Sequence, residues 1–422
     1  MPHFGPNVAD MSTATRTGPR PSTRHDDAPG RTSTPGRRIV SRPLALVFLS
    51  EFCALTSFYL LLSVTPMYAA AAGAGSAGAG LVTGVLLLGT VAAELAAPIL
   101  MRRYGYWTML ITGALLLGVP TLALLPGGSL VTIVAVSVVR GLGFGLCTVM
   151  TGALTAVLLP PERRGEGLGL FGVVATAPGI VALPAGVWLA GHLGMAAVVG
   201  VTAATALIPL AAFPWLSGRA GRGAAQAPGT GTTRPDGLLA GLRQAGQLRP
   251  FLIFAASTVA GGVVVSFLPL AGVSGNVAAA GLLVQALTAT ISRWWAGRRG
   301  DRTGHTRLLV PALAIASLGM TAMIGLPSAA AVIAGMCLFG AGFGICQNAT
   351  FALMIGRMPP SGLGTASALW NLAYDAGYGA GPAVFGLVVG RTGYPAAFAL
   401  TAVLMLAALP AARRERPGGC GR

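Results

Sequence analysis

The sequence is poor in charged residues and contains no lysine. Only 9% of the 422 residues are charged and 54% are hydrophobic, whereas a typical soluble domain carries about 25% charged residues. A chain of this composition cannot cover itself with a polar surface, so we expect an integral membrane protein. Without lysine the chain also cannot form a nucleotide-binding loop of the G-x-x-x-x-G-K-[ST] type, which excludes a built-in ATP motor of that kind.

The few charges are unevenly divided between the two signs. The chain has 28 basic residues, all of them arginine, against 11 acidic residues, for a formal net charge of +17. Nearly all the arginines lie in the tails or in short segments between apolar runs, and no basic face is interleaved with aromatic residues. Membrane topology produces this pattern, so we expect the lipid bilayer as a partner and no nucleic acid.

Cysteine and histidine are also scarce. Four of the five cysteines fall inside apolar runs, the fifth lies in the C-terminal tail, and no C-x-x-C pair is present. None of the four histidines has a neighbour that could share a metal ion. The sequence therefore indicates no disulfide framework, no metal site and no cofactor.

Long apolar runs fill most of the chain. Crossing the hydrocarbon core takes about 20 apolar residues as a helix, and twelve runs meet that length. They predict an all-α integral membrane protein with twelve transmembrane helices, arranged as two pseudo-symmetric six-helix bundles. The expected spans are 43–67, 80–101, 107–125, 130–158, 167–190, 195–216, 250–271, 276–295, 307–326, 329–357, 364–389 and 394–412.

These spans divide the chain into five parts. The N-terminal bundle covers 43–216 and the C-terminal bundle covers 250–412. Residues 217–249 are rich in Gly, Ala, Thr and Arg and predict a cytoplasmic linker. The polar segment 1–42 predicts a disordered cytoplasmic tail, and 413–422 a second tail.

Arginine is confined almost entirely to one side of the predicted topology. If the N-terminus is cytoplasmic, the opposite loops contain Arg391 and no other arginine. This asymmetry predicts a multi-pass protein of the plasma membrane with both termini in the cytoplasm. The arginines on the cytoplasmic side, besides those in the tails, are Arg102, Arg103, Arg163, Arg164, Arg219, Arg222, Arg234, Arg243, Arg249, Arg298, Arg299, Arg302 and Arg307.

An internal repeat relates the two bundles. Residues 140–147, RGLGFGLC, align with residues 339–346, FGAGFGIC, at an offset of 199, and the same offset places the Pro-Pro pair 160–161 on the pair 359–360. Because six spans per half is an even number, the halves share one orientation, as parallel repeats do. A duplicated bundle of this kind encloses a midplane cavity, which favours transport.

The segment 297–305 reads GRRGDRTGH. It resembles the G-x-x-x-D-R-x-G-[RK] signature of the major facilitator superfamily, with His305 in place of the last basic residue, and the resemblance extends over the whole chain except its tails. It implies a major facilitator fold in which the acidic residue meets the N-terminal end of a helix in the other half and helps to close the cytoplasmic side, as the helix dipole favours. The gating residues implied are Gly297, Asp301, Arg302 and Gly304.

The first half departs from this signature. Pro98 stands at the first Gly position and Arg102 at the Asp position. We therefore expect the contact that closes the cytoplasmic side to be lost in this half or built differently. On the fourth span, Arg140 precedes closely spaced glycines, which resembles a motif of proton-coupled antiporters in the family. The helix-five antiporter signature G-x-x-x-G-P-x-x-G-G is matched only partly, at residues 179–186.

Ionisable residues inside the spans are the candidates for proton coupling, because charges at that depth are costly and usually functional. Glu51 and Arg140 lie at similar depths on spans that line one cavity in the family. A carboxylate there can exchange a proton if it alternates between apolar and Arg-paired surroundings. The alternative is a static pair that joins two helices. The proton-coupling candidates are Glu51, Arg140 and Asp375.

The remaining polar residues of the spans have several possible roles. Glu94 precedes the degenerate first-half motif by about one turn, which favours a structural pair with Arg102 or Arg103. Asp375 can equally bind substrate or pair across the interface between the halves. The substrate-cavity candidates are Gln347, Asn348, Asn371 and Tyr374.

Together these features indicate a secondary active transporter rather than an enzyme. The expected substrate is a small apolar or amphipathic compound, such as a drug or secondary metabolite, exported by a monomer in exchange for protons. An uptake carrier for a sugar or other small metabolite is the first alternative, which counterflow in inverted vesicles separates from export. An integral-membrane transferase is a remote alternative. Such enzymes need clustered Asp, His or metal-binding residues at the membrane face, and the sequence shows no such cluster.

The arginine asymmetry can be tested with reporter fusions. A reporter that is active only in the cytoplasm is expected to work after Arg222 and after Arg414, and to be silent near Gly127, because arginine-rich segments stay in the cytoplasm. Reporter activity normalised to fusion-protein abundance is the measurement. Activity near Gly127 would contradict the twelve-span topology.

Overall fold

A computed structural model of the chain describes residues 41–125, 127–159, 164–215, 241–242, 246–359 and 362–415. All of them belong to one compact unit that begins at Ile39. Most of the predicted tails and most of the predicted linker lie outside the described residues.

The described chain is almost entirely helical. Its first half contains α1 (Arg42–Leu62), α2 (Thr65–Ala69), the π-helix η1 (Ala70–Ala74), α3 (Gly75–Tyr104), α4 (Tyr106–Gly118), the 3₁₀-helix η2 (Val119–Leu124), α5 (Leu130–Leu158), α6 (Arg164–His192), α7 (Met195–Leu207) and η4 (Ile208–Trp215). Its second half contains α10 (Leu248–Phe267), η5 (Leu268–Leu270), α11 (Gly275–Thr303), α12 (Thr306–Ala322), η6 (Met323–Gly325), α13 (Ala329–Gly356), α14 (Leu363–Ala407) and α15 (Leu409–Arg413).

Nine helical segments of the described chain are long and apolar enough to cross a membrane. Two of them, Arg42–Tyr104 with 63 residues and Leu363–Arg413 with 51 residues, are too long for one crossing, since about 20 residues span the core. Each of these two doubles back once and so crosses twice. With the shorter apolar helix Met195–Ala211, the crossings number twelve, and the predicted fold class is confirmed.

Glycines make the two reversals possible. The turn between α1 and α3 contains Gly73 at φ 85° and Gly75 at φ 60°, and the turn within α14 lies at Gly393, at φ 76°. Positive φ is strained for residues with a Cβ atom and free of that strain for glycine. The expected break between the spans 364–389 and 394–412 is therefore a sharp kink at a single residue inside α14.

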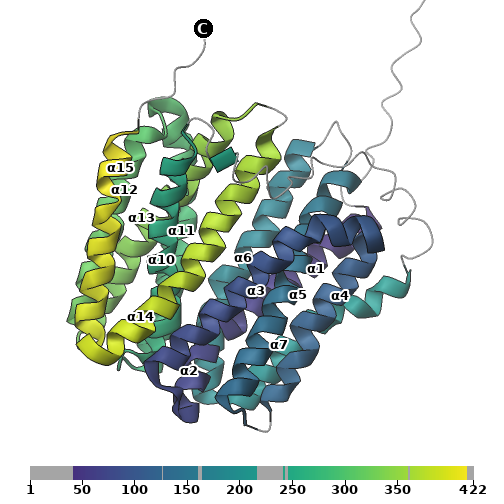
Figure 1. Cartoon of the computed structure of the whole chain (residues 1–422), viewed down its shortest axis with the longest axis horizontal. Coiled ribbons are helices and arrows are strands. Elements are labelled where there is room, and N and C mark those ends of the chain that lie inside the picture. Colours follow the sequence, from purple (N-terminus) through teal and green to yellow (C-terminus); the bar gives the residue numbers. More distant parts are fainter. Residues whose placement is uncertain are drawn as a thin grey trace, which may run out of the picture. The chain divides into compact units, whose positions relative to one another are not determined.

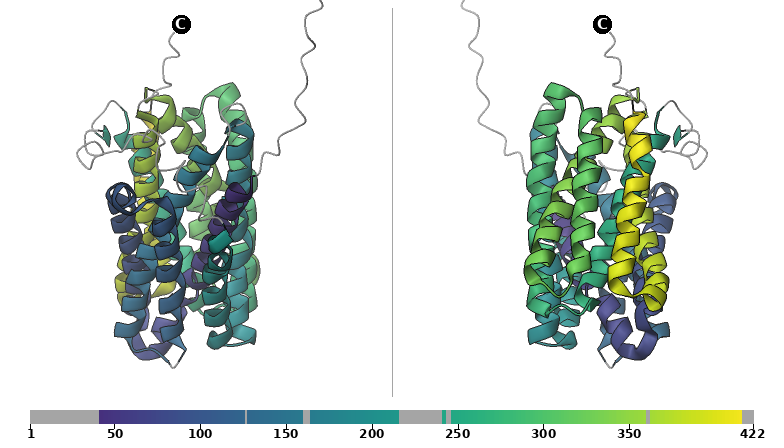
Figure 2. Two further views of the ribbon diagram at one scale, coloured as in Figure 1. Left: turned by 90° about the vertical axis from the view of Figure 1, so that its right-hand side faces the viewer. Right: turned by 90° about the vertical axis from the view of Figure 1, so that its left-hand side faces the viewer.

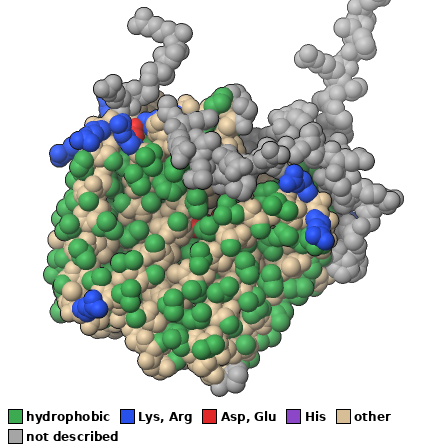
Figure 3. All heavy atoms as spheres, viewed as in Figure 1, with side chains coloured by type: hydrophobic (Ala, Val, Ile, Leu, Met, Phe, Trp, Pro, Cys, Tyr) green, Lys and Arg blue, Asp and Glu red, His purple; other side chains and the backbone are tan. Residues whose placement is uncertain are grey.

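The helices run alongside one another, and the two described ends of the chain lie at the same end of the bundle (Figures 1 and 2). We call the face that carries Ser41 and Glu415 the terminal face. The side chains on the bundle's flank in Figure 3 are mostly hydrophobic, with arginines at its margins. Large apolar side chains such as Val131, 78% exposed, and Leu88, 67% exposed, suit a lipid environment and would be unfavourable in water.

Glycines on the fourth helix of each half bring it to its neighbours at backbone distance. A Cβ atom at Gly141 would lie 2.0 Å from the Leu86 carbonyl oxygen, and one at Gly340 would lie 2.4 Å from the Gln285 carbonyl oxygen. Both the glycines and their partners are related by the offset of 199, so the repeat read from the sequence is also a repeat of contacts. The other equivalent contacts are Gly143 with Gly113 and Leu117, Gly145 with Thr90, Gly342 with Ala312 and Ala316, and Gly344 with Ala289.

The two halves close against each other on the side away from the terminal face. There Ser76 Oγ of α3 donates to the Gly386 carbonyl of α14 at 2.8 Å. Thr83 Oγ1 of α3 and Ser266 Oγ of α10 share a hydrogen bond of 3.0 Å, and both side chains are buried. We call these contacts between α3 and the second half the α3 seal.

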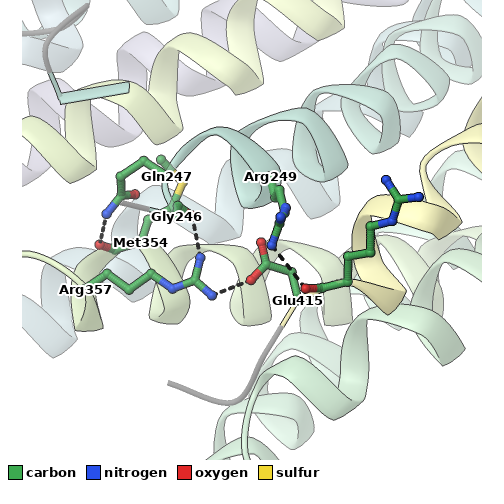
Figure 4. A network of polar contacts seen from close by, with 7 residues as sticks. Gly246, Gln247, Arg249, Met354, Arg357 and Glu415 are labelled. Atoms are coloured by element: carbon green, nitrogen blue, oxygen red, sulfur yellow. Dashed lines mark hydrogen bonds and ion pairs between the residues drawn. The ribbon is translucent and has the colours of Figure 1, made fainter. Parts of the chain in front are cut away.

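A polar network fastens the second half at the terminal face (Figure 4). Arg357, just after α13, forms an ion pair with Glu415, and it also donates to the Gly246 carbonyl. Gln247 donates to the Met354 carbonyl at 3.0 Å, and Arg249 donates to a backbone carbonyl beside Glu415 at 3.1 Å. The network joins the start of α10, the end of α13 and the segment after α15.

The α3 seal can be tested through Gly80. A Cβ atom there would lie 2.0 Å from the Pro382 carbonyl oxygen, so Gly80→Ala should disfavour the sealed state. Overpacking costs about 1–3 kcal/mol, which corresponds to about tenfold or more in the open population. A cysteine at Thr83, in a background without native cysteines, is then expected to react about that much faster with a membrane-impermeant maleimide applied from the side opposite the terminal face.

The matched control is Gly172→Ala, since a Cβ atom at Gly172 has nothing within 4 Å. That change should leave the labelling rate of the Thr83 cysteine as it is in the parent. Equal labelling rates in Gly80→Ala and Gly172→Ala would show that the seal does not depend on this contact.

Candidate functional site

A cavity of about 500 Å³ lies between the two halves of the described chain and is lined by both. Its wall reaches toward the terminal face, because it includes Phe171 near the start of α6 and Ser367 near the start of α14. The α3 seal closes the opposite side. The polar residues that line the cavity are Glu51, Tyr59, Glu94, Thr148, Thr176, Gln285, Thr290, Arg293, Gln347, Ser367, Asn371, Tyr374, Asp375 and Tyr378.

Glu51 lies on this wall with a single side-chain partner. Its carboxylate, on α1, accepts a hydrogen bond from Thr151 Oγ1 of α5, and only 5% of the residue is exposed. A buried carboxylate with one hydroxyl donor leaves most of its acceptor capacity unused among the described residues.

Arg140 is held elsewhere. Its guanidinium donates to the Leu117 carbonyl at 2.7 Å, to the Ser57 carbonyl at 2.9 Å and to Thr121 Oγ1. Ser57 lies six residues beyond Glu51 on α1, about 9 Å along the helix axis. The expected pairing of Glu51 with Arg140 is therefore not formed in this structure, and Arg140 instead ties α5 to α1 and α4.

A second acidic group in the cavity is formed by one residue from each half. Glu94 of α3 and Asp375 of α14 both line the cavity, and their carboxyl groups are within hydrogen-bonding reach of each other. Asp375 is 7% exposed. The expected pairing of Glu94 with Arg102 or Arg103 is wrong: those arginines lie in the last turn of α3, about two turns farther on, and Glu94 faces the second half.

The cavity also contains an arginine that the sequence reading missed. Arg293 of α11 lines the wall together with Tyr59 and Tyr374, and the residue is exposed. It falls inside the predicted span 276–295, where an arginine is as conspicuous as Arg140. The offset of 199 makes Arg293 the equivalent of Glu94, so equivalent positions of the two halves carry opposite charges.

Three of the four predicted substrate-cavity residues lie on the wall, namely Gln347, Asn371 and Tyr374. Asn348 does not belong to it. Its amide packs over Gly297 of α11, where a Cβ atom would lie 3.4 Å from Asn348 Nδ2. Neighbouring positions on a helix point about 100° apart, and here Gln347 faces the cavity while Asn348 faces α11.

The loop motif lies at the end of α11 on the terminal face. Gly304 follows the helix at φ +88°, a conformation that favours glycine. The Asp301 side chain is 78% exposed and lies 3.8 Å from His305 Nε2. In this state, with the cavity reaching toward the terminal face, the aspartate is exposed to solvent, and Arg302 beside it is exposed as well.

The described residues contain no group of three or more His, Cys, Asp or Glu side chains that could hold a metal ion. The cavity chemistry available in them is therefore that of carboxyl groups, one guanidinium, hydroxyl and amide groups, and aromatic rings.

Comparison with known proteins identifies the family. The family model of the Major Facilitator Superfamily matches residues 47–382, most of the chain. The chain belongs to the Major Facilitator Superfamily and is a multi-pass membrane transporter.

Two relatives resemble parts of the sequence. The chain is 33% identical over 127 residues to the tetracenomycin C resistance and export protein of Streptomyces glaucescens, an alignment that covers 30% of this chain and 23% of that protein. It is 28% identical over 114 residues to an uncharacterized MFS-type transporter of Salmonella typhimurium, covering 27% of this chain and 29% of that one. The chain thus aligns with about a quarter of the length of each.

Solved structures share the fold at low sequence identity. The nucleoside transporter NupG has a TM-score of 0.70 at 14% identity, covering 89% of this chain and 99% of that one. A bacterial homolog of the human lysosomal transporter Spinster, in an inward-facing and unoccupied conformation, has a TM-score of 0.68 at 17% identity, covering 88% and 96%. These similarities show the twelve-helix fold alone.

Proposed function

We propose that the protein is a proton-coupled exporter of a small, amphipathic compound, working as a monomer. The observation that carries this proposal is the contact between the carboxyl groups of Glu94 and Asp375, which join the two halves inside the cavity. One chain encloses the whole cavity, so no second subunit is needed to complete the site.

The chemistry of the contact favours a proton. An ionised carboxylate has only acceptor atoms, so two carboxyl groups can hydrogen-bond only if a proton lies between them. Like charges this close otherwise repel. Removal of the proton would therefore push α3 and α14 apart, and its return would let them approach. A proton that binds more favourably in one arrangement of the halves than in the other shifts the equilibrium between them.

Glu51 is the second candidate for the residue that carries the exchanged proton. It lies on the same wall and is isolated from Arg140, so a change in its own protonation would not break an ion pair with that residue. Arg140, which donates to two backbone carbonyls and a hydroxyl, has the structural role of joining three helices.

The orientation in the membrane follows from the arginines. The terminal face carries Arg102, Arg103, Arg298, Arg299 and Arg302, all exposed, and the positive-inside rule places such a face in the cytoplasm. The cavity would then be accessible from the cytoplasm, with the α3 seal on the outer side of the plasma membrane. A cytoplasmic substrate could enter this state directly.

Export is favoured over uptake by the relative of Streptomyces glaucescens, whose name describes resistance and export. Uptake of a polar metabolite remains the competing function, since the nucleoside transporter NupG shares the fold. The two are separated by loading inverted vesicles: an exporter concentrates substrate inside them when their interior is acidified.

We also propose that the motif residues Gly297, Asp301, Arg302 and Gly304 form a gate on the cytoplasmic side. Asp301 is the acidic residue of the motif, while the equivalent position in the first half is Arg102. Asp301→Asn is therefore expected to reduce transport several-fold and to increase labelling of cysteines introduced on the cytoplasmic side of the cavity. Arg102→Ala is the matched change and should have the smaller effect; equal losses would contradict an asymmetric gate.

Neutral replacements test proton coupling. Asp375→Asn is expected to reduce pH-driven accumulation to the level of passive equilibration, while downhill exchange of substrate persists, because an amide keeps the shape of the protonated acid and cannot release a proton. Glu94→Gln should act in the same way, whereas Asp375→Glu should retain part of the coupling. Accumulation is measured with and without a pH gradient and normalised to protein in the membrane.

Glu51→Gln is compared under the same conditions. If it abolishes pH-driven accumulation and the two changes at Glu94 and Asp375 do not, Glu51 is the carrier and the inter-half pair has a structural role. Unchanged pH-driven accumulation in all three variants would contradict proton coupling through the cavity carboxyls.

A further inference from the structure

In the part of the chain that the structure describes, Arg293 has no charged partner. Among the described residues, none forms an ion pair or a hydrogen bond with it, although it lines a cavity within the membrane-spanning region. A charge at this depth is unfavourable unless it is paired or serves a bound ligand. Arg293 lies one turn beyond the close contact between Ala289 and Gly344, which fixes where α11 carries this residue.

Two tyrosines share the cavity wall with this arginine. Tyr59 of α1 and Tyr374 of α14 line the same cavity as Arg293. A guanidinium has only donors, and a hydroxyl can donate as well as accept. The three side chains, which come from three helices and both halves, therefore present several donors to one cavity.

The carboxyl groups of the same cavity have other partners. Glu94 and Asp375 contact each other, and Glu51 accepts from Thr151. The ion pairs of the described residues are His305 with Asp301 and Arg357 with Glu415, and neither includes Arg293. An anion beside Arg293 would thus meet a cation whose charge is not already neutralised.

Aromatic rings lie next to this group of donors. Trp370, Tyr374 and Tyr378 follow one another at four-residue intervals on α14 and line the cavity. The rings of Tyr374 and Tyr378 are stacked with centroids 5.2 Å apart, and those of Trp370 and Tyr374 lie 6.0 Å apart. Trp370 Nε1 donates to Thr350 Oγ1 at 3.2 Å, which fixes the indole. Phe254 stacks on Trp370 with ring centroids 4.5 Å apart, so the row offers a planar ligand those parts of the rings that line the cavity.

We propose that Arg293, with the hydroxyls of Tyr59 and Tyr374, binds the acidic group of a planar aromatic substrate whose rings pack on Trp370 and Tyr378. The substrate class is a small aromatic compound that carries a carboxylate or an acidic phenol. The cavity of about 500 Å³ suits a ligand of drug size, for which pockets of about 300–1,000 Å³ are typical. This inference rests on the proposed function, because it names the substrate class of the same cavity.

Three probes with the same ring system separate the contribution of the acidic group to binding from the contribution of the rings. They are anthracene-2-carboxylate, its methyl ester and 2-(aminomethyl)anthracene, bound to the purified full-length protein in lipid nanodiscs and measured by equilibrium dialysis. The carboxylate is expected to bind about tenfold or more tightly than the ester, as a charge-assisted hydrogen bond implies, and the amine should bind most weakly. In Arg293→Gln the carboxylate should lose this advantage while binding of the ester changes little.

Arg298→Gln is the matched control, because Arg298 lies on the same helix outside the cavity, over the ring of Trp294. It should leave all three affinities unchanged. Trp370→Ala should weaken the carboxylate and the ester alike, because it removes ring contacts and leaves the arginine. Retained ester binding shows that Arg293→Gln and Arg298→Gln are folded, and size-exclusion chromatography checks the folding of Trp370→Ala. If Arg293→Gln does not fold, the order of the three affinities in the parent protein decides the case.

Several results would overturn the inference. These are preference for the amine, equal binding of carboxylate and ester by the parent protein, equal losses for both probes in Arg293→Gln, or no binding of any probe. Transport is measured separately, in proteoliposomes with an imposed pH gradient. A carboxylate that is bound through Arg293 and not moved would contradict the proposed function alone, whereas an amine that is bound and moved without dependence on Arg293 would contradict this inference alone.

Discussion

Backbone contact between helices, made possible by glycine, is the constraint on which the rest of this structure depends. Gly145 brings α5 onto the Thr90 carbonyl of α3, and Gly344 brings α13 onto the Ala289 carbonyl of α11. A side chain at either glycine would separate the helices and shift everything that follows along them. One turn beyond these contacts lie Glu94 and Arg293, the charged residues that α3 and α11 contribute to the cavity. The packing that holds each half together thus also fixes where its charge lies.

The cavity contains several carboxyl groups, each of which would be energetically unfavourable in a membrane without a polar partner. Glu94 and Asp375 reduce that cost by sharing one contact across the halves, and Glu51 does so through Thr151. The contact between Glu94 and Asp375 joins the two halves, which must move relative to each other if access alternates between the two sides. Polar pairs that join moving parts have two distinct states, made and broken, which is a property that a packed apolar core lacks.

The sequence predicted much of this fold because its signals are local. The apolar runs and the arginines on the cytoplasmic side can be read from neighbouring residues, and the 199-residue offset can be read from a duplicated pattern. The twelve crossings that these signals predict are confirmed. Pairing inside the membrane is not local. The depth of Glu51 and Arg140 could be estimated from the sequence, but depth does not tell which way a helix is turned. One residue of rotation changes direction by about 100°, so Arg140 reached carbonyl oxygens of α1 and α4 and not Glu51. Arg293 was detectable, as an arginine inside an expected span and as the equivalent of Glu94, but its place in the cavity required the structure.

The opposite charges at Glu94 and Arg293 have a consequence for how a ligand can lie. Two identical halves would make a cavity with a twofold axis, and a ligand could then enter it in two equivalent poses. A carboxyl at one of the equivalent positions and a guanidinium at the other remove that degeneracy, because a molecule with one polar end has different energies in the two poses. Duplication supplied the scaffold, and a single difference in sign between its copies gives the binding site a direction.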